Sequence, residues 1–429
     1  MANISYMNLG SIKGFNELFQ DDNNTTSNVL KLNKLECRTE NNQLYKIITY
    51  DKSVLNYDLV DTYGLCRSVI INSRNNVVGF APAKSFKADK FLELYPIPSE
   101  DIVAQEFVEG TMINVFFDPT IGLTGGWEIA TRNTVGATCG FFKTDNNAVN
   151  AVNTQKQEDK QENVKTSFRS MFLEAAKENN LVLENLNRKL CYSFVLQHPK
   201  NRIVIPIKKP QLYLVAVYFI DNTDPNNITV FTSDLQENKD YWFTTTIKFP
   251  ETYTFNDYNE LIDKYASMNT RYDKLGFVLY NKKTCHRTKI RNPVYEEVRH
   301  LRGNQTKLQF QYLTLRKEGK MNEFFKFFPE NKKECLLFRD QLHLFTNTLY
   351  DNYILCYVKK ATPLKEFSPQ YRKHMFHIHE KYKNELKEQK LFVTKKIVID
   401  YVNNLQPQFL MHSLNYNCNL HVNDIKKQM

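Results

Sequence analysis

The chain has 429 residues, enough for two or three domains that each bury a core. Its 42% apolar and 24% charged residues are typical of a globular protein and exclude a disordered or fibrous chain. Lys and Arg exceed Asp and Glu by 57 − 47 = 10, a balance that favours polyanionic partners without identifying one.

The cysteines and the N-terminal segment indicate the kind of compartment. The eight cysteines form no C-x-x-C pair and have no cluster of histidines near them, so we expect reduced thiols and no metal site. The opening MANISYMNLG lacks the basic start and apolar core of a signal peptide. No apolar run reaches the roughly 18 residues of a membrane span. We therefore expect an intracellular protein without a membrane segment.

Strand patterns dominate the first three quarters of the chain. The polar stretches 21–28 and 153–165 predict surface loops or insertions. Residues 166–187 open with Thr and Ser and carry apolar residues at helical spacing, which predicts a helix. Short runs rich in β-branched and aromatic residues predict strands at 45–50, 68–73, 77–82, 112–117, 127–132, 191–197, 202–207, 211–220 and 276–281.

The pattern changes near residues 315–320, where helical spacing replaces alternation. Residues 376–404 also look helical. We expect a first domain of residues 1–315, with an upstream segment of residues 1–100, and a mostly helical C-terminal domain of residues 316–429. One helical face is formed by Cys335, Phe338, Leu342, Phe345 and Leu349.

Four stretches resemble the RNA-repair ligases of tailed phages, which belong to the covalent nucleotidyltransferase superfamily of ligases and capping enzymes. The resemblance covers roughly residues 45–300. The stretches are 65-LCRSVIINSRNNVVGFAPAKSF-86, 105-QEFVEGTMINVFF-117 with 129-IATRNTVG-136, 192-YSFVLQHPKNRIVIP-206 and 274-KLGFVLYNKKTCHRTKIRNPVY-295. They are similar, in order, to the upstream basic segment, to motif I (K-x-D/E-G-S/T), to F-E-x-x-x-P-x-N-R-I-V, and to motifs IV and V (E-G-x-V, then K-I-K and Tyr).

The resemblance implies an α+β nucleotidyltransferase domain (ATP-grasp-like) with antiparallel sheets, followed by the mostly helical C-terminal domain. In that family a lysine attacks the α-phosphate of ATP and becomes a covalent Lys–AMP. Acidic residues of the later motifs hold the ribose and a divalent metal ion, and the lysines of motif V clamp the α-phosphate. These roles are expectations that come from the resemblance.

Three departures from the family pattern remove the groups that carry its chemistry. Phe107 stands where motif I has its lysine, and Val195 and Leu275 stand where two glutamates are expected. Phenylalanine cannot form a phosphoramidate, and valine and leucine offer no oxygen to a hard cation. We therefore expect no catalytic residue, no bound metal and no cofactor. ATP and Mg²⁺ are expected only if the alignment is shifted or if Lys84 or Lys90 replaces the missing nucleophile.

The basic residues of the framework remain, and they point to phosphates. The candidate phosphate or nucleic-acid contacts are Arg67, Lys84, Arg132, Arg202, Lys289 and Arg291. Further cations interleave with His and Tyr over residues 282–310, a composition that suits a nucleic-acid backbone and stacked bases. If five or six phosphates were contacted, affinity would fall with salt at a log–log slope of about −4 to −5. The plain alternative is a solvated basic face, with Ile290 turned to the core between Lys289 and Arg291.

The sequence therefore favours an RNA-ligase-like protein of a large DNA virus that has lost ligase chemistry. It is expected to bind RNA or DNA in the host cytoplasm or viral factory, with packaging in virions as an open alternative. Two other functions stay open: an active ATP-dependent RNA ligase with displaced catalytic residues, and a viral structural or scaffold protein. The apolar stretches 335–358 and 391–402 predict either a helical core or a groove for a viral protein partner.

Overall fold

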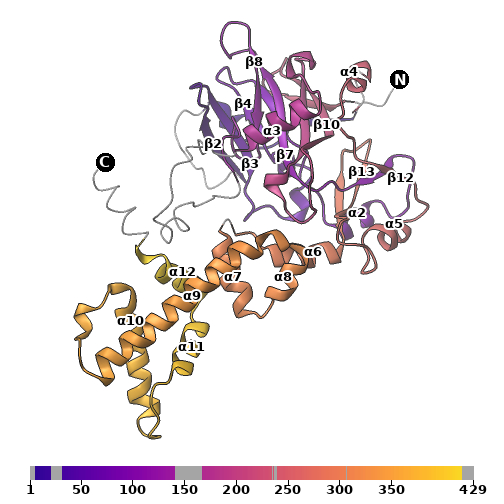
Figure 1. Cartoon of the computed structure of the whole chain (residues 1–429). Helices are drawn as coiled ribbons and strands as arrows, with labels where there is room; N and C mark the ends of the chain where they lie inside the picture. The colour runs from indigo at the N-terminus through magenta and orange to yellow at the C-terminus, as the bar shows by residue number, and fades with distance from the viewer. Residues whose placement is uncertain are drawn as a thin grey trace. The chain divides into compact units, whose positions relative to one another are not determined.

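The computed structural model describes residues 5–20, 31–140, 167–233, 235, 239–305 and 307–417. Two compact units are present, and among the described residues the first ends at Glu297 and the second begins at Val298. The first unit holds the sheets and the second is helical (Figure 1), so the predicted α+β class with a helical C-terminal region is confirmed. The polar stretches 21–28 and 153–165, which are predicted to be surface loops or insertions, lie outside the described residues.

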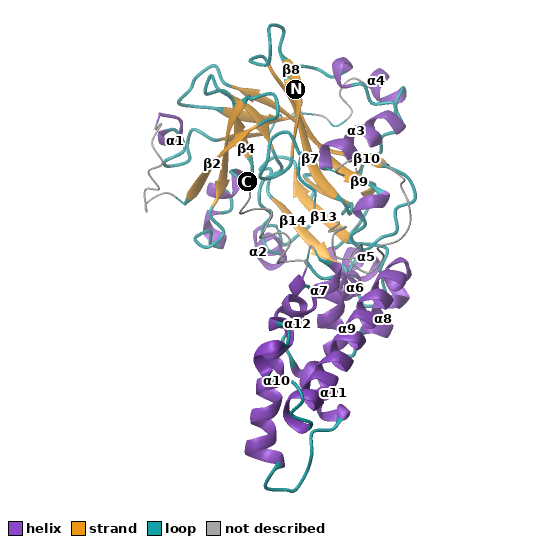
Figure 2. Cartoon of the chain, turned by 60° about the vertical axis from the view of Figure 1, so that its left-hand side comes forward, coloured by secondary structure: helices purple, strands orange, loops and turns teal. Residues whose placement is uncertain are grey.

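Within the described residues, the first unit contains three sheets whose paired strands are all antiparallel (Figure 2). The six-stranded sheet has the order β1 (Tyr6–Asn8), β11 (Thr229–Thr232), β10 (Gln211–Asp221), β9 (Leu190–Gln197), β7 (Thr111–Asp118) and β8 (Gly126–Ala130). One four-stranded sheet has the order β12 (Thr252–Tyr253), β6 (Ile102–Glu106), β13 (Gly276–Asn281) and β14 (Arg287–Arg291). The other has the order β2 (Leu32–Arg38), β3 (Leu44–Tyr50), β4 (Val69–Ile71) and β5 (Val77–Phe80).

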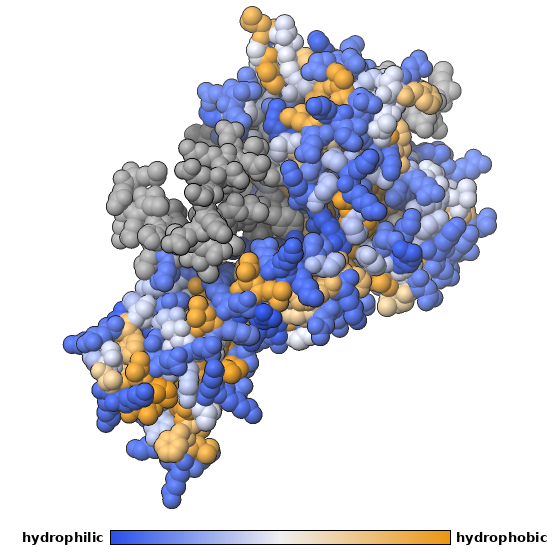
Figure 3. Space-filling view, in the orientation of Figure 1, coloured by the Kyte–Doolittle hydropathy of each residue, from blue (hydrophilic) through white to orange (hydrophobic). Residues whose placement is uncertain are grey.

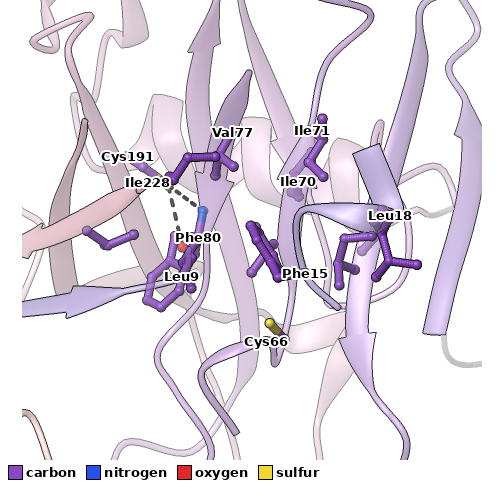
Figure 4. Close-up of a cluster of buried hydrophobic side chains, with 14 of the residues drawn as sticks. Leu9, Phe15, Leu18, Cys66, Ile70, Ile71, Val77, Phe80, Cys191 and Ile228 are labelled. Atoms are coloured by element: carbon purple, nitrogen blue, oxygen red, sulfur yellow. Dashed lines mark hydrogen bonds between the residues drawn. The ribbon is translucent and has the colours of Figure 1, made fainter. Parts of the chain in front are cut away.

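Buried contacts join two of these sheets into one core. The Phe80 amide donates to the Cys191 sulfur at 3.3 Å, which ties β5 to β9 inside an apolar cluster (Figure 4). The fully buried Asp118 carboxylate at the end of β7 accepts from the Tyr45 hydroxyl at 2.7 Å and from the Asn72 amide at 2.8 Å. A buried charge is tolerated only when its oxygens are satisfied, and these bonds supply that satisfaction.

Helix α3 (Phe168–Glu178) packs against β9 and β10 and begins at a capping box made by Ser167 and Ser170. The predicted helix over 166–187 is too long. It ends at Asn179 because Asn180 adopts a left-handed φ of 55° and the Asn179 side chain donates to the Ala175 carbonyl. The other helices of this unit are α1 (Glu17–Gln20), α2 (Ala88–Leu94), α4 (Lys239–Phe243) and α5 (Tyr258–Tyr265).

The predicted strand at 202–207 is wrong. Asn201 ends a 3₁₀ turn, and the following residues form no ladder. The Val204 and Ile205 amides donate to the Glu109 carboxylate instead of to a neighbouring strand. Pro206 also lacks an amide hydrogen.

The second unit is built on helix α9 (Lys332–Tyr353), which buries the apolar face predicted over 335–349. Residues 376–404, which look helical in the sequence, are mostly helical but interrupted. Helix α10 (Pro369–Lys381) passes into a π-helical turn at Tyr382–Leu386, and a new helix starts only after the Thr394 N-cap. The remaining helices are α6 (Pro293–Arg302), which spans the unit boundary, α7 (Leu308–Lys317), α8 (Met321–Phe327), α11 (Lys395–Asn404) and α12 (Pro407–Leu414).

The second unit leaves apolar side chains in contact with solvent. In Figure 3 hydrophobic and hydrophilic patches alternate over the visible face of its helices. Among the exposed side chains are Val358 (60% exposed), Phe376 (48%), Phe392 (77%) and Phe409 (66%). Across the described ranges, none of the helices combines the length and apolar content needed to cross a bilayer.

Candidate functional site

The segment that follows β6 meets the start of β13. The Phe107 amide donates to the Gly276 carbonyl at 3.2 Å, one step beyond the pair formed by Glu106 and Phe277. Gly276 has a φ of 125°, and a Cβ there would lie 2.1 Å from the Ile290 carbonyl oxygen. Only glycine fits this position, so β13 and β14 can bring their backbones together beside Phe107.

The three positions that depart from the ligase pattern are apolar and largely covered. Phe107 is half-buried, and Val195 and Leu275 are 6% and 8% exposed. Val195 pairs with Met112 between β9 and β7, and a Cβ on Gly110 would lie 2.6 Å from the Val195 Cγ1 atom. Val195 therefore packs beside the loop that follows Phe107. That all three side chains line one pocket stays a prediction.

Glu109 is the acidic residue of the motif I stretch, and its buried carboxylate binds backbone amides of this chain. Its carboxylate is 4% exposed and accepts from the Val204 amide at 3.2 Å and the Ile205 amide at 3.0 Å. Burial raises the pKa of Glu109, while hydrogen bonds from Tyr295 and the two amides and the charge of Arg202 act in the opposite direction. Glu109 thus fixes the segment after Asn201 to the loop just before the start of β7.

Strand β14 presents a row of cations on one face. Arg287, Lys289 and Arg291 alternate with Thr288 and Ile290, and the latter two point to the opposite, core-facing side of the sheet. The Lys289 Nζ atom lies 4.9 Å from the centre of the Phe107 ring, and the Arg291 guanidinium carbon lies 5.9 Å from it. Both distances are within the range of a cation–π contact.

Lys289 is the most perturbed base of this site. Its pKa falls from the ordinary lysine value of 10.5 to about 6, chiefly because burial disfavours the charged form. The positive charges of Arg287, Arg67, Arg291 and Lys84 lower the pKa further, in that order. The structure therefore groups Lys289 with three other sequence-predicted residues, Arg67, Lys84 and Arg291. We call these four residues together with Arg287 the cation cluster.

The cation cluster contains one member that sequence reasoning missed. Arg287 is not among the sequence-predicted site residues, although it stands two positions before Lys289 and therefore on the same face of β14. Burial lowers its pKa to about 10, and the charge of Arg67 acts in the same direction. The sequence does carry a signal for Arg287, because alternate residues of a strand share a face and Arg287 continues the alternation of Lys289 and Arg291 toward the N-terminus.

The other two predicted cations occupy different surroundings. Arg132 lies beside the cluster, because its charge helps to lower the pKa of Arg67, and its guanidinium is 5.1 Å from the Tyr50 ring centre. Arg202 donates from Nε to the Val204 carbonyl at 3.0 Å and acts on the buried Glu109. Arg202 therefore supports the segment after β9, and no interaction described above joins it to Lys289.

Carboxylates contribute little charge to this group of cations. Arg291 pairs with Glu296 at 3.4 Å, on the exposed side of β14. Within the described ranges, no three His, Cys, Asp or Glu side chains are grouped so as to hold a metal ion. The arrangement suits an anion, since Lys289 and Arg291 meet at one aromatic side chain and further cations lie near enough to lower the pKa of Lys289.

Comparison with known proteins gives one sequence relative. No family model matches the chain. The RNA ligase of Rhodothermus phage RM378 is 22% identical over 245 residues, which are 51% of this chain and 50% of the relative. The match thus spans about half the length of that curated relative.

Two solved structures of RNA ligases show a weak likeness to this fold. A mutant of the Naegleria gruberi RNA ligase with ATP and Mn aligns with 51% of this chain and 57% of its own, at 12% identity and a TM-score of 0.33. An archaeal ATP-dependent RNA ligase aligns with 92% and 77%, at 10% identity and a TM-score of 0.32. The expected resemblance to RNA ligases is confirmed at the level of sequence, because about half of this chain is similar to a phage RNA ligase.

Proposed function

We propose that this chain is a nucleotidyltransferase-like protein of a large DNA virus that has lost ligase chemistry and binds nucleic acid, RNA in the first place. The observation that carries the proposal is the contact of Lys289 and Arg291 with Phe107. Cations that could hold phosphate are kept, while an aromatic ring stands where the resemblance implies the nucleophile.

The side chains at the three departing positions do not fit the chemistry of an ATP-dependent ligase. Phe107 has no lone pair with which to attack phosphorus. Val195 and Leu275 have no oxygen with which to ligate Mg²⁺, a cation that demands oxygen ligands. The proposal therefore includes no adenylylation step at Phe107 and no metal ion held by Val195 and Leu275.

The cation cluster supports binding of a polyanion. Bringing like charges together inside a half-buried site costs free energy, and a phosphate backbone offsets that cost. Binding of this kind releases condensed counterions, so it weakens as salt rises. We expect RNA to be retained at low salt and released at high salt.

Filter binding to single-stranded RNA over a series of salt concentrations tests this proposal. The double variant Lys289→Gln, Arg291→Gln should lower affinity by at least about tenfold and reduce the salt slope by about 1 to 2. The matched control is Lys282→Gln, Lys283→Gln, which removes two basic side chains from the exposed turn between β13 and β14. Equal losses in both double variants would mean that net charge alone binds RNA, and the site would be rejected.

A second candidate function, an active RNA ligase with a displaced nucleophile, is favoured by one observation. A lysine whose pKa is about 6 is mostly neutral near pH 7, which is the state that a nucleophilic amine needs. In that case the Lys289 Nζ atom would attack the α-phosphorus of ATP, the bond to the β-phosphate oxygen would break, and pyrophosphate would leave. The amine proton would pass to solvent.

Incubation with α-labelled ATP and a divalent cation, followed by denaturation, separates the two candidates. We expect no label on the protein. Label that maps to Lys289 by mass spectrometry and disappears in Lys289→Arg would overturn the loss of chemistry and establish the second candidate. Label at Lys84 or Lys90 would establish the same function with a different nucleophile.

A third candidate, a structural or scaffold protein, is favoured by the exposed apolar side chains of the second unit, such as Phe376 and Phe392. This candidate predicts stable co-purification with a viral protein partner and no salt-dependent retention on RNA. Substituting Phe376 and Phe392 by Ser should then abolish the co-purification. Location in the host cytoplasm, the viral factory or the virion is part of the same proposal and is tested by fractionating infected cells.

A further inference from the structure

The cation cluster brings several positive charges close together, and Glu296, which pairs with Arg291 at 3.4 Å, offsets only part of this charge. Every charge that shifts the pKa of Lys289 within the described chain is positive, and the four residues that carry these charges come from three places in the sequence. Arg287 and Arg291 flank Lys289 on β14, Arg67 precedes β4, and Lys84 follows β5. Such a cluster is unfavourable until an anion enters it.

We propose that the cation cluster binds one phosphodiester group of a nucleic acid without a metal ion, and that Lys289 takes up a proton as the phosphodiester binds. This inference rests on the proposed function, because it names the group recognised at the same site. The ligand chemistry is a backbone phosphodiester with a single negative charge.

The surroundings of Lys289 explain why its amine is poorly solvated before the anion arrives. Val278, 9% exposed, is its partner across the β13–β14 pair. The Phe107 ring lies 4.9 Å from Nζ. From β10, the buried Tyr218 contributes a phenol that interacts with Arg287 and Arg67, and its own pKa is raised by burial. Lys289 thus packs against apolar side chains, and the other cations of the cluster lie close enough to lower the pKa of its amine.

The electrostatic consequence is a change of protonation on binding. With a pKa of about 6, Lys289 is mostly neutral at pH 7 in the free protein. A phosphodiester stays negative throughout the neutral range, so its presence raises the pKa of the amine beside it. The bound form therefore carries a proton that the free form lacks.

The direction of the pH dependence follows from linkage. Above pH 6, binding requires a proton, and the association constant falls as pH rises. The fall is about tenfold per pH unit until the pKa of Lys289 in the complex is reached, and there is no such fall below pH 6. An ordinary surface lysine, charged in both states over this range, would give no pH dependence.

Isothermal titration calorimetry tests the inference directly. A single-stranded RNA oligonucleotide without terminal phosphates is titrated into the full chain at pH 7.5 with EDTA, in buffers of different ionisation enthalpy. The wild-type protein should take up about one proton per binding event. Lys289→Arg should bind at least as tightly at this pH and take up close to none, because arginine stays charged.

The outcomes distinguish this inference from the function on which it rests. RNA binding without proton uptake by the wild-type protein would overturn the inference and leave the proposed function standing. Binding that appears only after Mg²⁺ is added would also overturn it. Absence of RNA binding at low salt at pH 6 and at pH 7.5 would overturn both. The wild-type buffer series decides the matter even if Lys289→Arg does not fold.

Discussion

The Nζ atom of Lys289 lies 4.9 Å from the centre of the Phe107 ring, although the two residues are 182 positions apart in the chain (289 − 107). This contact joins the position where the ligase resemblance implies an attacking amine to the position where it implies a phosphate clamp. An aromatic ring cannot transfer a nucleotide, but its face stabilises a neighbouring cation. The pair is therefore suited to holding an anion nearby and not to forming a bond with it.

The first prediction concerns the free energy of unfolding and Lys289. The folded-state pKa of about 6 lies below the ordinary value of 10.5, so between these values the unfolded chain binds a proton that the folded chain does not. Stability should therefore rise with pH in this window, by up to about 1.4 kcal/mol per pH unit from this group. The slope should disappear in Lys289→Met.

Hydrogen exchange of peptides from β13 and β14, followed from pH 6.5 to 9, measures this slope after correction for the intrinsic exchange rate. Lys282→Met, at an exposed position of the turn between the two strands, should leave it unchanged. Identical slopes in the wild type and in Lys289→Met would show that Lys289 is charged in the folded protein.

The second prediction concerns the glycine of the motif I stretch. Gly110 has a φ of 152°, and an added Cβ would lie 2.5 Å from the Leu196 carbonyl oxygen. Gly110→Ala should destabilise the protein by roughly 2 to 4 kcal/mol, because both strain and overlap oppose it. Gly122→Ala is the control, since its φ is 59° and nothing lies within 4 Å, so only about 1 kcal/mol is expected.

Urea denaturation followed by circular dichroism compares the two alanine variants. A cost at Gly110 no larger than the cost at Gly122 would mean that the loop after Phe107 moves away from β9 at little expense. The packing of Val195 beside this loop would then be incorrect.

Much of the fold could be predicted from local pattern, because alternation and helical spacing reflect burial directly. The strands β3, β7, β9, β10 and β13 lie where β-branched and aromatic runs predict them. The prediction of a strand at 202–207 is wrong because of an interaction with a residue far away in the sequence. The amides of this segment are taken by Glu109, about 95 residues earlier in the chain, and no local pattern shows that competition.

The candidate site could be predicted only in part. Only the ligase resemblance indicated that Arg67 and Lys84 act at the same site as Lys289. Composition and spacing alone do not predict that these residues lie close together. The neutral state of Lys289 could not be predicted, because it depends on burial against Val278 and Phe107. The end of α3 could have been predicted from the sequence, since asparagine is a common signal of helix termination and Asn179 and Asn180 stand there in succession.

The third prediction concerns the second unit and its buried histidine. The His374 Nε2 atom contacts the Ser413 hydroxyl at 2.9 Å, and Nδ1 contacts the Tyr401 hydroxyl at 3.0 Å. Burial lowers the pKa of His374 to about 4, below its ordinary value of 6.5. The stability of this unit should therefore be complete above pH 6.5 and fall as pH drops toward 4, by up to about 1.4 kcal/mol per pH unit.

Hydrogen exchange of peptides from α10 in the full chain measures this loss. His374→Gln should be less stable at pH 7 and lose the pH dependence of this window. His377→Gln, on the exposed side of the same helix and paired with Glu380, should keep it. Loss of the pH dependence in the His377 variant alone would assign the effect to the surface pair.

The fourth prediction asks whether the scaffold can regain chemistry. The triple variant Phe107→Lys, Val195→Glu, Leu275→Glu places an amine and two carboxylates at the positions that the ligase resemblance implies. Incubation with α-labelled ATP and Mg²⁺ should then give some covalent labelling that maps to position 107. The yield should be low, because Val195 and Leu275 are buried and the new carboxylates lose hydration.

The matched control is Phe107→Leu, Val195→Glu, Leu275→Glu, which has the same carboxylates and no amine. It should bind no label, so any label on the triple variant belongs to the new lysine. If the triple variant folds, as judged by circular dichroism, and stays unlabelled over a range of pH and metal concentration, the three positions do not meet around a nucleotide. The apolar side chains would then be ordinary core residues, and the loss of ligase chemistry would need another explanation than their substitution.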